Sequence, residues 1–386
     1  MRAWPSIALS EVCEPANRFE APQTGCSYRQ VGVRLWGEGA YERDPIDGGD
    51  TRYTNFNRIE ANDLIVNKIW ARNGSVAVAT PELSGGYVST EFPAFELDQQ
   101  RILPGWMRFI TKSHRFWKAC DEKAQGTSGK NRIKPGQFLS IEVPLPPLAE
   151  QQAIVASLDA LIDKTRQLTT HLDAIEADAS ALVRTYLFGD AAKDYPRRRM
   201  SKLLTLRAPD VTVDRTQKYQ FAGVYSFGRG VFASANKMGS DFAYDRLSTV
   251  REGDFTYPKL MAWEGALGTV PPECDGMVVS PEFPVFTVNT NQVMPEVLDV
   301  YFRTPSIWSE LSALSGGTNL RRRRLQPGTF LDYEMPVPPM AIQYKIGELN
   351  KRARALNAHH AVIRANNAVL LAATLERMFN QGGRGL

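Results

Sequence analysis

An internal repeat covers almost the whole chain and constrains its fold more than any other feature. The segment KPGQFLSIEVPLPPLAEQ begins at Lys134, and QPGTFLDYEMPVPPMAIQ begins at Gln326. Upstream, a shift of 191 residues aligns the two halves, and one residue is inserted in the second copy before Pro327. The aligned pairs include Tyr28 with Tyr219, Gly37 with Gly228, Asp63 with Asp254, Lys68 with Lys259 and Trp117 with Trp308. We interpret this pattern as a tandem duplication, which predicts two similar structural units.

Each half combines a β-rich segment with shorter amphipathic segments. Runs such as DLIVNKIW and SVAVAT, separated by glycines, predict short strands, and Pro-started segments such as PGWMRFITKSHRFWKAC predict helices. This mixture is typical of an α/β (α+β) domain. We therefore predict two similar globular domains, over residues 1–143 and 191–335.

A Pro-rich motif ends each predicted domain, and a long helix is expected to follow it. The prolines hold the chain extended and prevent a helix until the last of them has passed. We predict a Pro motif with a spacer helix over residues 144–190 and again over 336–386. A helix of about 40 residues spans roughly 60 Å. We expect the two helices to run antiparallel between the two domains, with the chain termini near each other.

Both helical segments carry the alternating four- and three-residue spacing of a coiled-coil seam. The predicted pairing residues are Leu158, Leu161, Leu168, Leu172, Ile175 and Leu182 in the first helix, and Ile346, Leu349, Leu356, Ile363 and Leu370 in the second. His360 and Asn367 are polar members of the second seam, and they either fix the register or lie on a solvent-facing flank. Residues 149–187 have a net charge of −3 and residues 340–379 a net charge of +4, which favours pairing between the two helices.

Composition places few limits on function. No opening apolar stretch resembles a signal peptide and no stretch is long enough to span a membrane, so a cytoplasmic location is the expectation. The four cysteines have no Cys-x-x-Cys spacing and do not coincide between the repeats, which argues against a disulfide framework or a zinc site. A net charge of +4 is too small to indicate nucleic acid by itself.

Motifs of catalysis are missing from the sequence. No Asn/Asp-Pro-Pro-aromatic methyltransferase motif and no phosphate-binding P-loop is present, and GEG at Gly37 and GRG at Gly228 are too short for nucleotide fingerprints and predict turns. The four histidines lack metal-ligand spacing. Asp121-Glu122-Lys123 resembles half of a nuclease motif, but its partner is lacking and the second repeat does not reproduce it. We expect neither a catalytic site nor a metal site in this chain.

A Gly-rich basic loop precedes each Pro motif. KAQGTSGKNRIK begins at Lys123 and GGTNLRRRRL at Gly316, and neither contains an acid. A run of arginines is often only a solvated surface, but its recurrence at corresponding places favours contact with phosphates, and Arg and Asn can also reach base edges. The candidate DNA-binding residues are Lys68, Arg72, Asn73, Lys130, Asn131, Arg132, Lys134, Lys259, Asn319, Arg321, Arg322, Arg323 and Arg324. Because Arg72 and Asn73 align with Trp263 and Glu264, we expect the two domains to read different sequences.

The segment VPLPPLAEQQAIVASLDALID, repeated in part as MPVPPMAIQ, resembles the specificity (S, HsdS-like) subunit of type I restriction-modification systems. The resemblance extends over essentially the entire chain, as two target recognition domains that are each followed by a helical region. The second motif departs from the first, because Ala341-Ile342-Gln343 replaces Ala149-Glu150-Gln151.

The resemblance implies a non-catalytic, sequence-specific DNA-binding subunit that reads a bipartite asymmetric site. In that family, each recognition domain reads one half of the site, and the helices set the gap and dock two modification (methyltransferase) subunits. These partners carry S-adenosylmethionine and methylate adenine, restriction subunits can join them, and no cofactor is expected in the present chain. Two other functions stay open from the residues alone: a structural coiled-coil adaptor, and a solitary DNA nuclease or methyltransferase.

Overall fold

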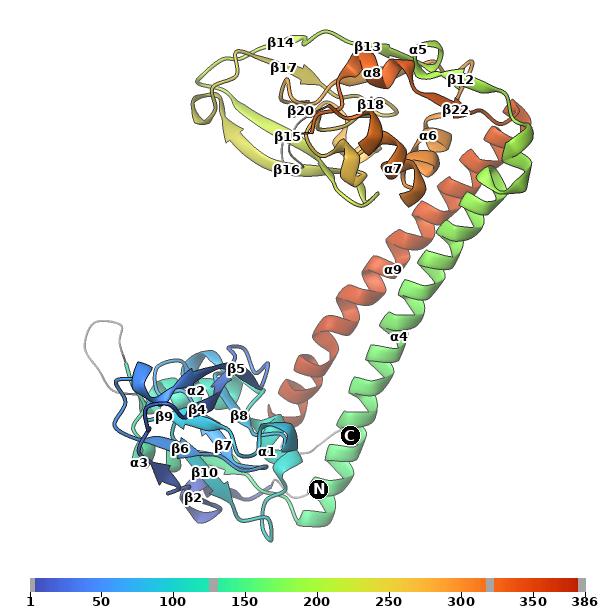
Figure 1. Cartoon of the computed structure of the whole chain (residues 1–386). Coiled ribbons are helices and arrows are strands. Elements are labelled where there is room, and N and C mark those ends of the chain that lie inside the picture. The colour runs from blue at the N-terminus through green and yellow to red at the C-terminus, as the bar shows by residue number, and fades with distance from the viewer. Residues whose placement is uncertain (1–3, 125–130, 317–322, 381–386) are drawn as a thin grey trace. The chain divides into compact units, whose positions relative to one another are not determined.

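The computed structural model describes residues 4–124, 131–316 and 323–380, and the chain divides into two compact units. Unit 1 comprises residues 1–170 together with 362–386, and unit 2 comprises residues 171–361. Two long helices, α4 (Leu148–Phe188) and α9 (Met340–Asn380), each contribute to both units (Figure 1). The part of each unit outside these helices is called its head.

Head 1 is built from three small sheets and three short helices. Its strands are β1 (Ser6–Ala8), β2 (Cys13–Pro15), β3 (Phe19–Glu20), β4 (Ser27–Val33), β5 (Ala40–Asp47), β6 (Phe56–Arg58), β7 (Leu64–Val66), β8 (Val76–Val78), β9 (Tyr87–Ser89), β10 (Ala94–Leu97) and β11 (Glu142–Pro144). They form sheets in the orders β1-β11, β2-β10-β7-β8 and β3-β6-β9-β4-β5. The helices are α1 (Pro104–Ile110), α2 (His114–Lys123) and α3 (Pro135–Leu139), and the 3-10 turns are η1 (Leu9–Glu11), η2 (Gly48–Asp50), η3 (Ala71–Asn73) and η4 (Pro81–Leu83).

Head 2 repeats this arrangement. Its strands are β12 (Arg197–Arg199), β13 (Leu204–Leu206), β14 (Val211–Thr212), β15 (Lys218–Tyr225), β16 (Gly230–Met238), β17 (Arg246–Thr249), β18 (Phe255–Thr256), β19 (Gly268–Thr269), β20 (Val278–Val279), β21 (Val285–Val288) and β22 (Glu334–Pro336). The sheet orders β12-β22, β13-β21-β18-β19 and β14-β17-β20-β15-β16 match those of head 1 strand for strand. The helices are α5 (Met200–Leu203), α6 (Pro295–Phe302), α7 (Pro305–Leu314) and α8 (Pro327–Asp332), with 3-10 turns η5 (Asp190–Asp194), η6 (Gly239–Asp241), η7 (Ala262–Glu264) and η8 (Pro272–Cys274).

The fold class predicted from the sequence is confirmed. The pairs of named strands are antiparallel in both heads, apart from β4 with β9 and β15 with β20, so the α+β description fits the described residues. The identical strand order of the two heads agrees with a tandem duplication. Proline stands at the first position of α1, α3, α6, α7 and α8, where its missing N–H leaves no helix hydrogen bond unmade.

The glycine pairs that predict turns lie at the tips of long hairpins, as expected. Gly37 and Gly39 join β4 to β5 with φ angles of +70° and +94°, and Gly228 and Gly230 join β15 to β16 with φ angles of +66° and +85°. These angles are in the left-handed region, which glycine adopts without a steric penalty. The prediction of turns at these glycines is therefore confirmed.

The glutamine of each Pro motif fastens the long helix to its head. The buried Gln151 side chain accepts a hydrogen bond from Leu103 N at 2.8 Å and donates to the carbonyl oxygens of Arg101 and Pro146. Gln343 does the same in unit 2, accepting from Met294 N at 2.8 Å and donating to the carbonyls of Gln292 and Pro338. Within each Pro motif, the glutamine is therefore the residue that forms the hydrogen bonds between the long helix and its head. The preceding Glu150 is exposed, which explains why Ile342 can replace it at the corresponding place.

In each unit, one end of α4 packs with the opposite end of α9. In unit 1, Ile154 and Leu158 of α4 share the core around Trp106 with Leu375, Met378 and Phe379 of α9. In unit 2, Leu187 of α4 packs with Ile346 of α9 and Val300 of α6, with Val183, Phe188 and Ile342 beside them. Both contacts are those of antiparallel helices, as predicted.

The ends of the described chain meet within unit 1. Trp4 and Phe379 both contact Trp106, with ring-centroid distances of 5.4 and 5.5 Å. The expectation that the two ends of the chain lie near each other therefore holds for the described residues.

The predicted pairing seam is only partly correct. Leu158, Leu172 and Ile346 are buried and Leu161 is half-buried, but the remaining predicted pairing residues are 37% to 71% exposed: Leu168, Ile175, Leu182, Leu349, Leu356, Ile363 and Leu370. In a straight α-helix, residues seven positions apart are rotated by about 20° relative to one another. Residues that follow a strict heptad pattern therefore turn gradually away from the buried face of the helix. Beyond Leu172 the buried face passes through Glu176, Val183 and Leu187.

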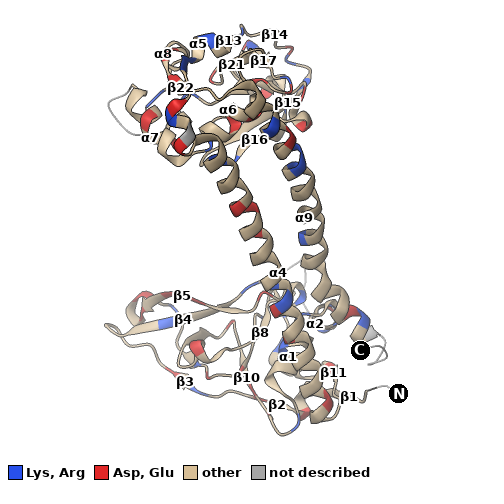
Figure 2. Cartoon of the chain, turned by 90° about the vertical axis from the view of Figure 1, so that its right-hand side faces the viewer, with Lys and Arg blue, Asp and Glu red and all other residues tan. Residues whose placement is uncertain are grey.

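The polar seam residue His360 is buried rather than solvent-facing. Its side chain is 5% exposed, and Nδ1 lies 2.8 Å from Oε1 of Glu176 on α4. Figure 2 shows the charged positions along both helices. Of the two interpretations of this histidine, a role in fixing the register of α4 against α9 agrees with the structure.

Candidate nucleic-acid interface

In head 1, the end of the basic loop is fastened beside β7. Ile133 N donates to the carbonyl oxygen of Lys68 at 2.9 Å, and Lys68 N donates to the carbonyl oxygen of Glu91 at 3.1 Å. The Arg132 guanidinium forms an ion pair with Glu91, Nη1 to Oε1 3.1 Å. Lys68, Arg132 and Lys134, which are distant in the sequence, are thereby brought into one region of the head.

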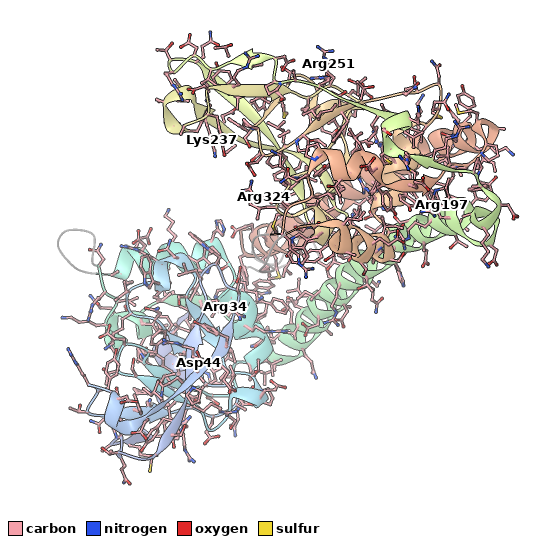
Figure 3. The ribbon with its side chains drawn as sticks, turned by 45° about the horizontal axis from the view of Figure 1, so that its top comes forward. Arg34, Asp44, Arg197, Lys237, Arg251 and Arg324 are labelled. Atoms are coloured by element: carbon pink, nitrogen blue, oxygen red, sulfur yellow. The ribbon has the colours of Figure 1, made fainter. Side chains whose placement is uncertain are left out.

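Head 2 repeats each of these contacts. Leu325 N donates to the carbonyl oxygen of Lys259 at 2.9 Å, and Lys259 N donates to the carbonyl oxygen of Glu282 at 3.0 Å. Arg324, labelled in Figure 3, pairs with Glu282 at 3.1 Å. Arg324 N also donates to the carbonyl of Gly316, which closes the base of the loop. We call Lys68, Arg132, Lys259 and Arg324 the loop-base cations.

The remaining predicted contact residues have varied surroundings. Lys134 is exposed directly before α3, Asn131 is half-buried, and the half-buried Arg323 donates from Nη1 to Oγ of Ser312 at 2.8 Å. Arg72 and Asn73 lie in η3, away from the end of the loop along the chain. Lys130, Asn319, Arg321 and Arg322 lie outside the described residues.

A hollow of about 260 Å³ adjoins the loop end in head 1. Its lining is mainly apolar, with polar groups from a few side chains that include Asn17, Asn57, Lys68, Ser89 and Thr90. Pro135 at the start of α3 also lines it. Lys68 thus lines the same hollow as Asn57 of β6 and Ser89 of β9.

A buried carboxylate stabilises corresponding loops of both heads. Asp63 accepts from Glu60 N at 2.8 Å and pairs with Arg18, and Asp254 accepts from Arg251 N at 2.9 Å and pairs with Arg207 Nη1 at 2.8 Å. Burial raises the pKa of both carboxyl groups despite these partners. Each of these aspartates has an arginine partner, which identifies a structural ion pair rather than an acid-base catalyst.

The surface near these loops contains residues that our sequence interpretation missed. Trp36 and Phe227 occupy the tips of the β4–β5 and β15–β16 hairpins and are 59% and 65% exposed. Both have a positive φ, 59° and 63°. The available signal was the aromatic residue directly before the turn glycine in both repeats, at Trp36-Gly37 and Phe227-Gly228.

Neither a metal site nor a membrane-spanning helix is found within the described ranges. Among residues 4–124, 131–316 and 323–380 no group of three or more His, Cys, Asp or Glu side chains is arranged to hold a metal ion. The helices within the same ranges include none that is long and apolar enough to cross a membrane. Cys13, Cys120 and Cys274 are buried free thiols, and Cys26 is an exposed one.

Comparison with known proteins identifies a domain family in the first part of the chain and a similar fold over all of it. Residues 1–177 match the family model of the type I restriction modification DNA specificity domain. The fold of the whole chain is similar to the HsdS subunit from Thermoanaerobacter tengcongensis, with a TM-score of 0.53 and 18% identity over 98% of this chain and 96% of that one. A chain from a structure of the type I R-M system, described for complex assembly and conformational transition, gives a TM-score of 0.58 and 15% identity over 100% and 98%. No curated protein sequence matches.

These matches do not support the coiled-coil adaptor or the solitary enzyme that the residues alone left open. The matched family model describes a DNA specificity domain, in agreement with the DNA-binding role expected from the sequence. Residues 1–177 therefore carry a type I restriction modification DNA specificity domain, and the fold of the whole chain, with both repeats, is similar to that of an HsdS subunit.

Proposed function

We propose that each head reads one half of a bipartite, asymmetric DNA site, and that the loop-base cations contact its phosphates. The observation that carries this proposal is the repetition of one arrangement in both heads. A Gly-rich basic loop, a lysine at a strand end and an arginine paired with a glutamate recur with the same hydrogen bonds. A cation held at one place by a carboxylate is oriented before DNA arrives, and phosphate oxygens can share its remaining N–H donors.

The two heads would read different base sequences. The first basic loop differs from the second in sequence, and η3 presents Arg72 and Asn73 where η7 presents Trp263 and Glu264. Arginine suits guanine and asparagine suits adenine in the major groove, whereas glutamate accepts a hydrogen bond from cytosine. The proposed target is therefore asymmetric.

The long helices would set the unspecified gap and dock methyltransferase subunits. The exposed aliphatic residues of α4 and α9 that our seam prediction assigned to helix pairing are available for this purpose, for example Leu182, which is 71% exposed. Two similar units favour two modification subunits, with restriction subunits as further partners. S-adenosylmethionine would be held by the methyltransferase partners. Such a complex would act in the cytoplasm, where an exposed thiol such as Cys26 stays reduced.

Charge-removing variants of the loop-base cations test this proposal in the assembled complex. We expect Lys68→Gln with Arg132→Gln, and separately Lys259→Gln with Arg324→Gln, to weaken binding to a duplex that carries the site mapped by methylome sequencing. The plot of log K against log salt should also become less steep, with a slope that is less negative by roughly 0.9 for each phosphate that a variant no longer neutralises.

The matched control is Lys193→Gln. Lys193 is an exposed cation that is likewise paired with an acid, Asp190, but it lies in η5 and outside the basic loops. The control should leave the slope unchanged. If both double variants kept the wild-type slope, the loop-base cations would not contact phosphates.

A further inference from the structure

The tips of the two long hairpins carry the same unusual feature. Trp36 and Phe227 are bulky residues in the left-handed region, with φ of 59° and 63°, where side chains with a Cβ are strained. Glycine or asparagine would occupy these positions at lower cost. The strain is nevertheless present in both heads, at positions related by the shift that aligns the repeats.

A matching network fixes both tips. Trp36 N donates to the carbonyl of Asn73 at 2.7 Å, and Gly37 N donates to that of Gly74 at 3.1 Å. Phe227 N donates to the carbonyl of Glu264 at 2.8 Å, and Gly228 N donates to that of Gly265 at 3.0 Å. The backbone conformation is thus imposed by the η3 and η7 turns, which fix the direction in which each aromatic side chain leaves the backbone before any ligand binds.

The rings are poorly covered by the protein itself. Trp36 lies 6.1 Å from the Trp117 ring and Phe227 lies 6.4 Å from the Trp308 ring, centroid to centroid, but both side chains stay more than half exposed. A residue whose only role was to cover the tryptophan beneath it would be buried against it. A strained, preoriented and exposed ring is instead suited to a ligand that offers a flat apolar face.

Cations lie directly under both tips, at corresponding positions. A Cβ at Gly37 would lie 3.2 Å from Cα and Cγ of Lys112. One at Gly228 would lie 3.1 Å from Cα of Arg303, and one at Gly230 would lie 2.7 Å from Nη2 of the same arginine. Arg303 also pairs with Asp299 at 2.9 Å, and Glu38 lies near Lys112. In the same hairpins, Arg34 (Figure 3) lies 4.6 Å over the Tyr41 ring, and Arg229 lies 4.5 Å over the Tyr225 ring.

An exposed aromatic ring next to fixed cations fits one class of ligand above others. Nucleic acid combines flat base faces with phosphates a few ångströms away, and proteins recognise it with this same combination. A hydrophobic protein partner would not need the cations, and a lipid surface would not need two separate single rings.

We propose that the hairpin-tip aromatics Trp36 and Phe227 stack against bases of the two DNA half-sites, one per head, while Lys112 and Arg303 contact the adjacent phosphates. This inference rests on the proposed function, since it requires that each head binds DNA. It assigns base contact to a surface separate from the basic loops. Because head 2 has Arg229 where head 1 has Glu38, the Phe227 contact is the stronger of the two.

Glycine variants of the tip residues separate this role from a structural one. Trp36→Gly and Phe227→Gly remove the ring and relieve the left-handed strain, so the thermal stability of the variants should equal or exceed that of the wild type. In the complex with methyltransferase subunits, each variant should lose roughly 5-fold to 150-fold in DNA affinity. The slope of log K against log salt should stay unchanged, because the ring carries no charge. Trp36→Phe and Phe227→Trp should retain most of the affinity.

A fluorescent base reports the contact directly. A duplex carrying the methylome-mapped site, with 2-aminopurine placed at each position of one half-site in turn, should change in fluorescence at one position on binding the wild type. The same position should stay silent with Trp36→Gly or Phe227→Gly. Tyr53→Ala, which removes an aromatic side chain that is 43% exposed elsewhere in head 1, is the control and should keep both the signal and the affinity.

Two results would overturn the inference while leaving the proposed function intact. The first is unchanged affinity in both glycine variants while the loop-base variants still flatten the salt dependence. The second is failure of the glycine variants to assemble with methyltransferase subunits, since that would make the tips a protein-docking surface.

Discussion

Heads 1 and 2 agree where side chains fix the backbone and differ where side chains face solvent. Trp117 and Trp308 donate from Nε1 to a backbone carbonyl at 2.7 Å in each head, and Gly74 and Gly265 lie against their rings. On the surface, Arg34 over Tyr41 in head 1 corresponds to Tyr225 stacked on Phe232 at 3.7 Å in head 2. The duplicated fold therefore supports two different surfaces on one framework, as the proposed reading of an asymmetric site requires.

The contact of glycine with tryptophan should be the most sensitive part of the shared framework. A Cβ at Gly265 would lie 2.3 Å from the Trp308 ring at a φ of +78°, so we expect Gly265→Ala to destabilise unit 2 by about 2–5 kcal/mol through overpacking and left-handed strain. Gly74→Ala should do the same in unit 1, where the corresponding distance to Trp117 is 2.6 Å. Denaturant unfolding of each variant provides the measurement.

Gly276 and Gly85 provide matched controls for this comparison. They have φ angles of +75° and +76°, but a Cβ at either would meet no atom within 4 Å. Gly276→Ala and Gly85→Ala should therefore cost only the conformational part, about 1–2 kcal/mol. Equal losses in all four variants would show that the packing on tryptophan is unimportant.

The glutamines of the two Pro motifs should show a smaller effect. Gln343→Ala leaves Met294 N and the Pro338 carbonyl without their partner in a buried place, so we expect a loss of about 1–3 kcal/mol in unit 2. Gln151→Ala should cost slightly more in unit 1, because the bond to Arg101 is 2.9 Å whereas the matching bond to Gln292 is 3.3 Å.

Glu150→Ile is the natural control, since it copies into the first motif the residue of the second. Glu150 is exposed, and its Oε1 accepts from Trp4 Nε1 at 2.8 Å. We expect a change of less than about 1 kcal/mol in thermal or denaturant unfolding. A loss as large as that of Gln151→Ala would contradict the assignment of the motif's fastening role to the glutamine.

Thiol labelling should report the unfolding of the two units separately, with only one conservative substitution. Burial raises the pKa of Cys13 to about 12 and also raises that of Cys120, so neither thiol should react with Ellman's reagent at pH 8 in the folded protein. One rapidly reacting thiol is expected, Cys26, and Cys26→Ser should remove it. In that variant, labelling in increasing denaturant reports unit 1 through Cys13 and Cys120 and unit 2 through Cys274. Rapid native labelling of Cys26→Ser would contradict the burial.

The duplicated framework could be predicted from the sequence. Which side chains lie next to one another on the surface of each head could not. Glycines with positive φ, such as Gly37 and Gly228, and prolines at helix starts have local steric causes, so their roles could be inferred from single positions. The proximity of Lys68 to Arg132 depends on backbone hydrogen bonds between segments far apart in the chain. In the sequence, only the recurrence of a lysine and a basic loop in both repeats suggested that these residues act together.

The helix seam shows why the rest could not be predicted. A strict heptad pattern assigned Ile175 and Leu182 to the contact, yet the contact follows the true helical period and passes to Val183 and Leu187. The hairpin-tip aromatics were missed for another reason. Nothing in the local pattern around Trp36 shows that the η3 turn, far along the chain, holds its backbone in the left-handed region.

The core of unit 1 is completed by residues of α9, and this determines the order in which the protein can finish folding on the ribosome. Leu375, Met378 and Phe379 emerge after both heads, although they pack against Trp106 of the head that emerges first. Unit 2 is one continuous segment, residues 171–361. Nascent chains usually fold their N-terminal domain first. Here the core of the head that is synthesised first is complete only when the last turns of α9 have been made, and the second unit is the first whose residues are all present.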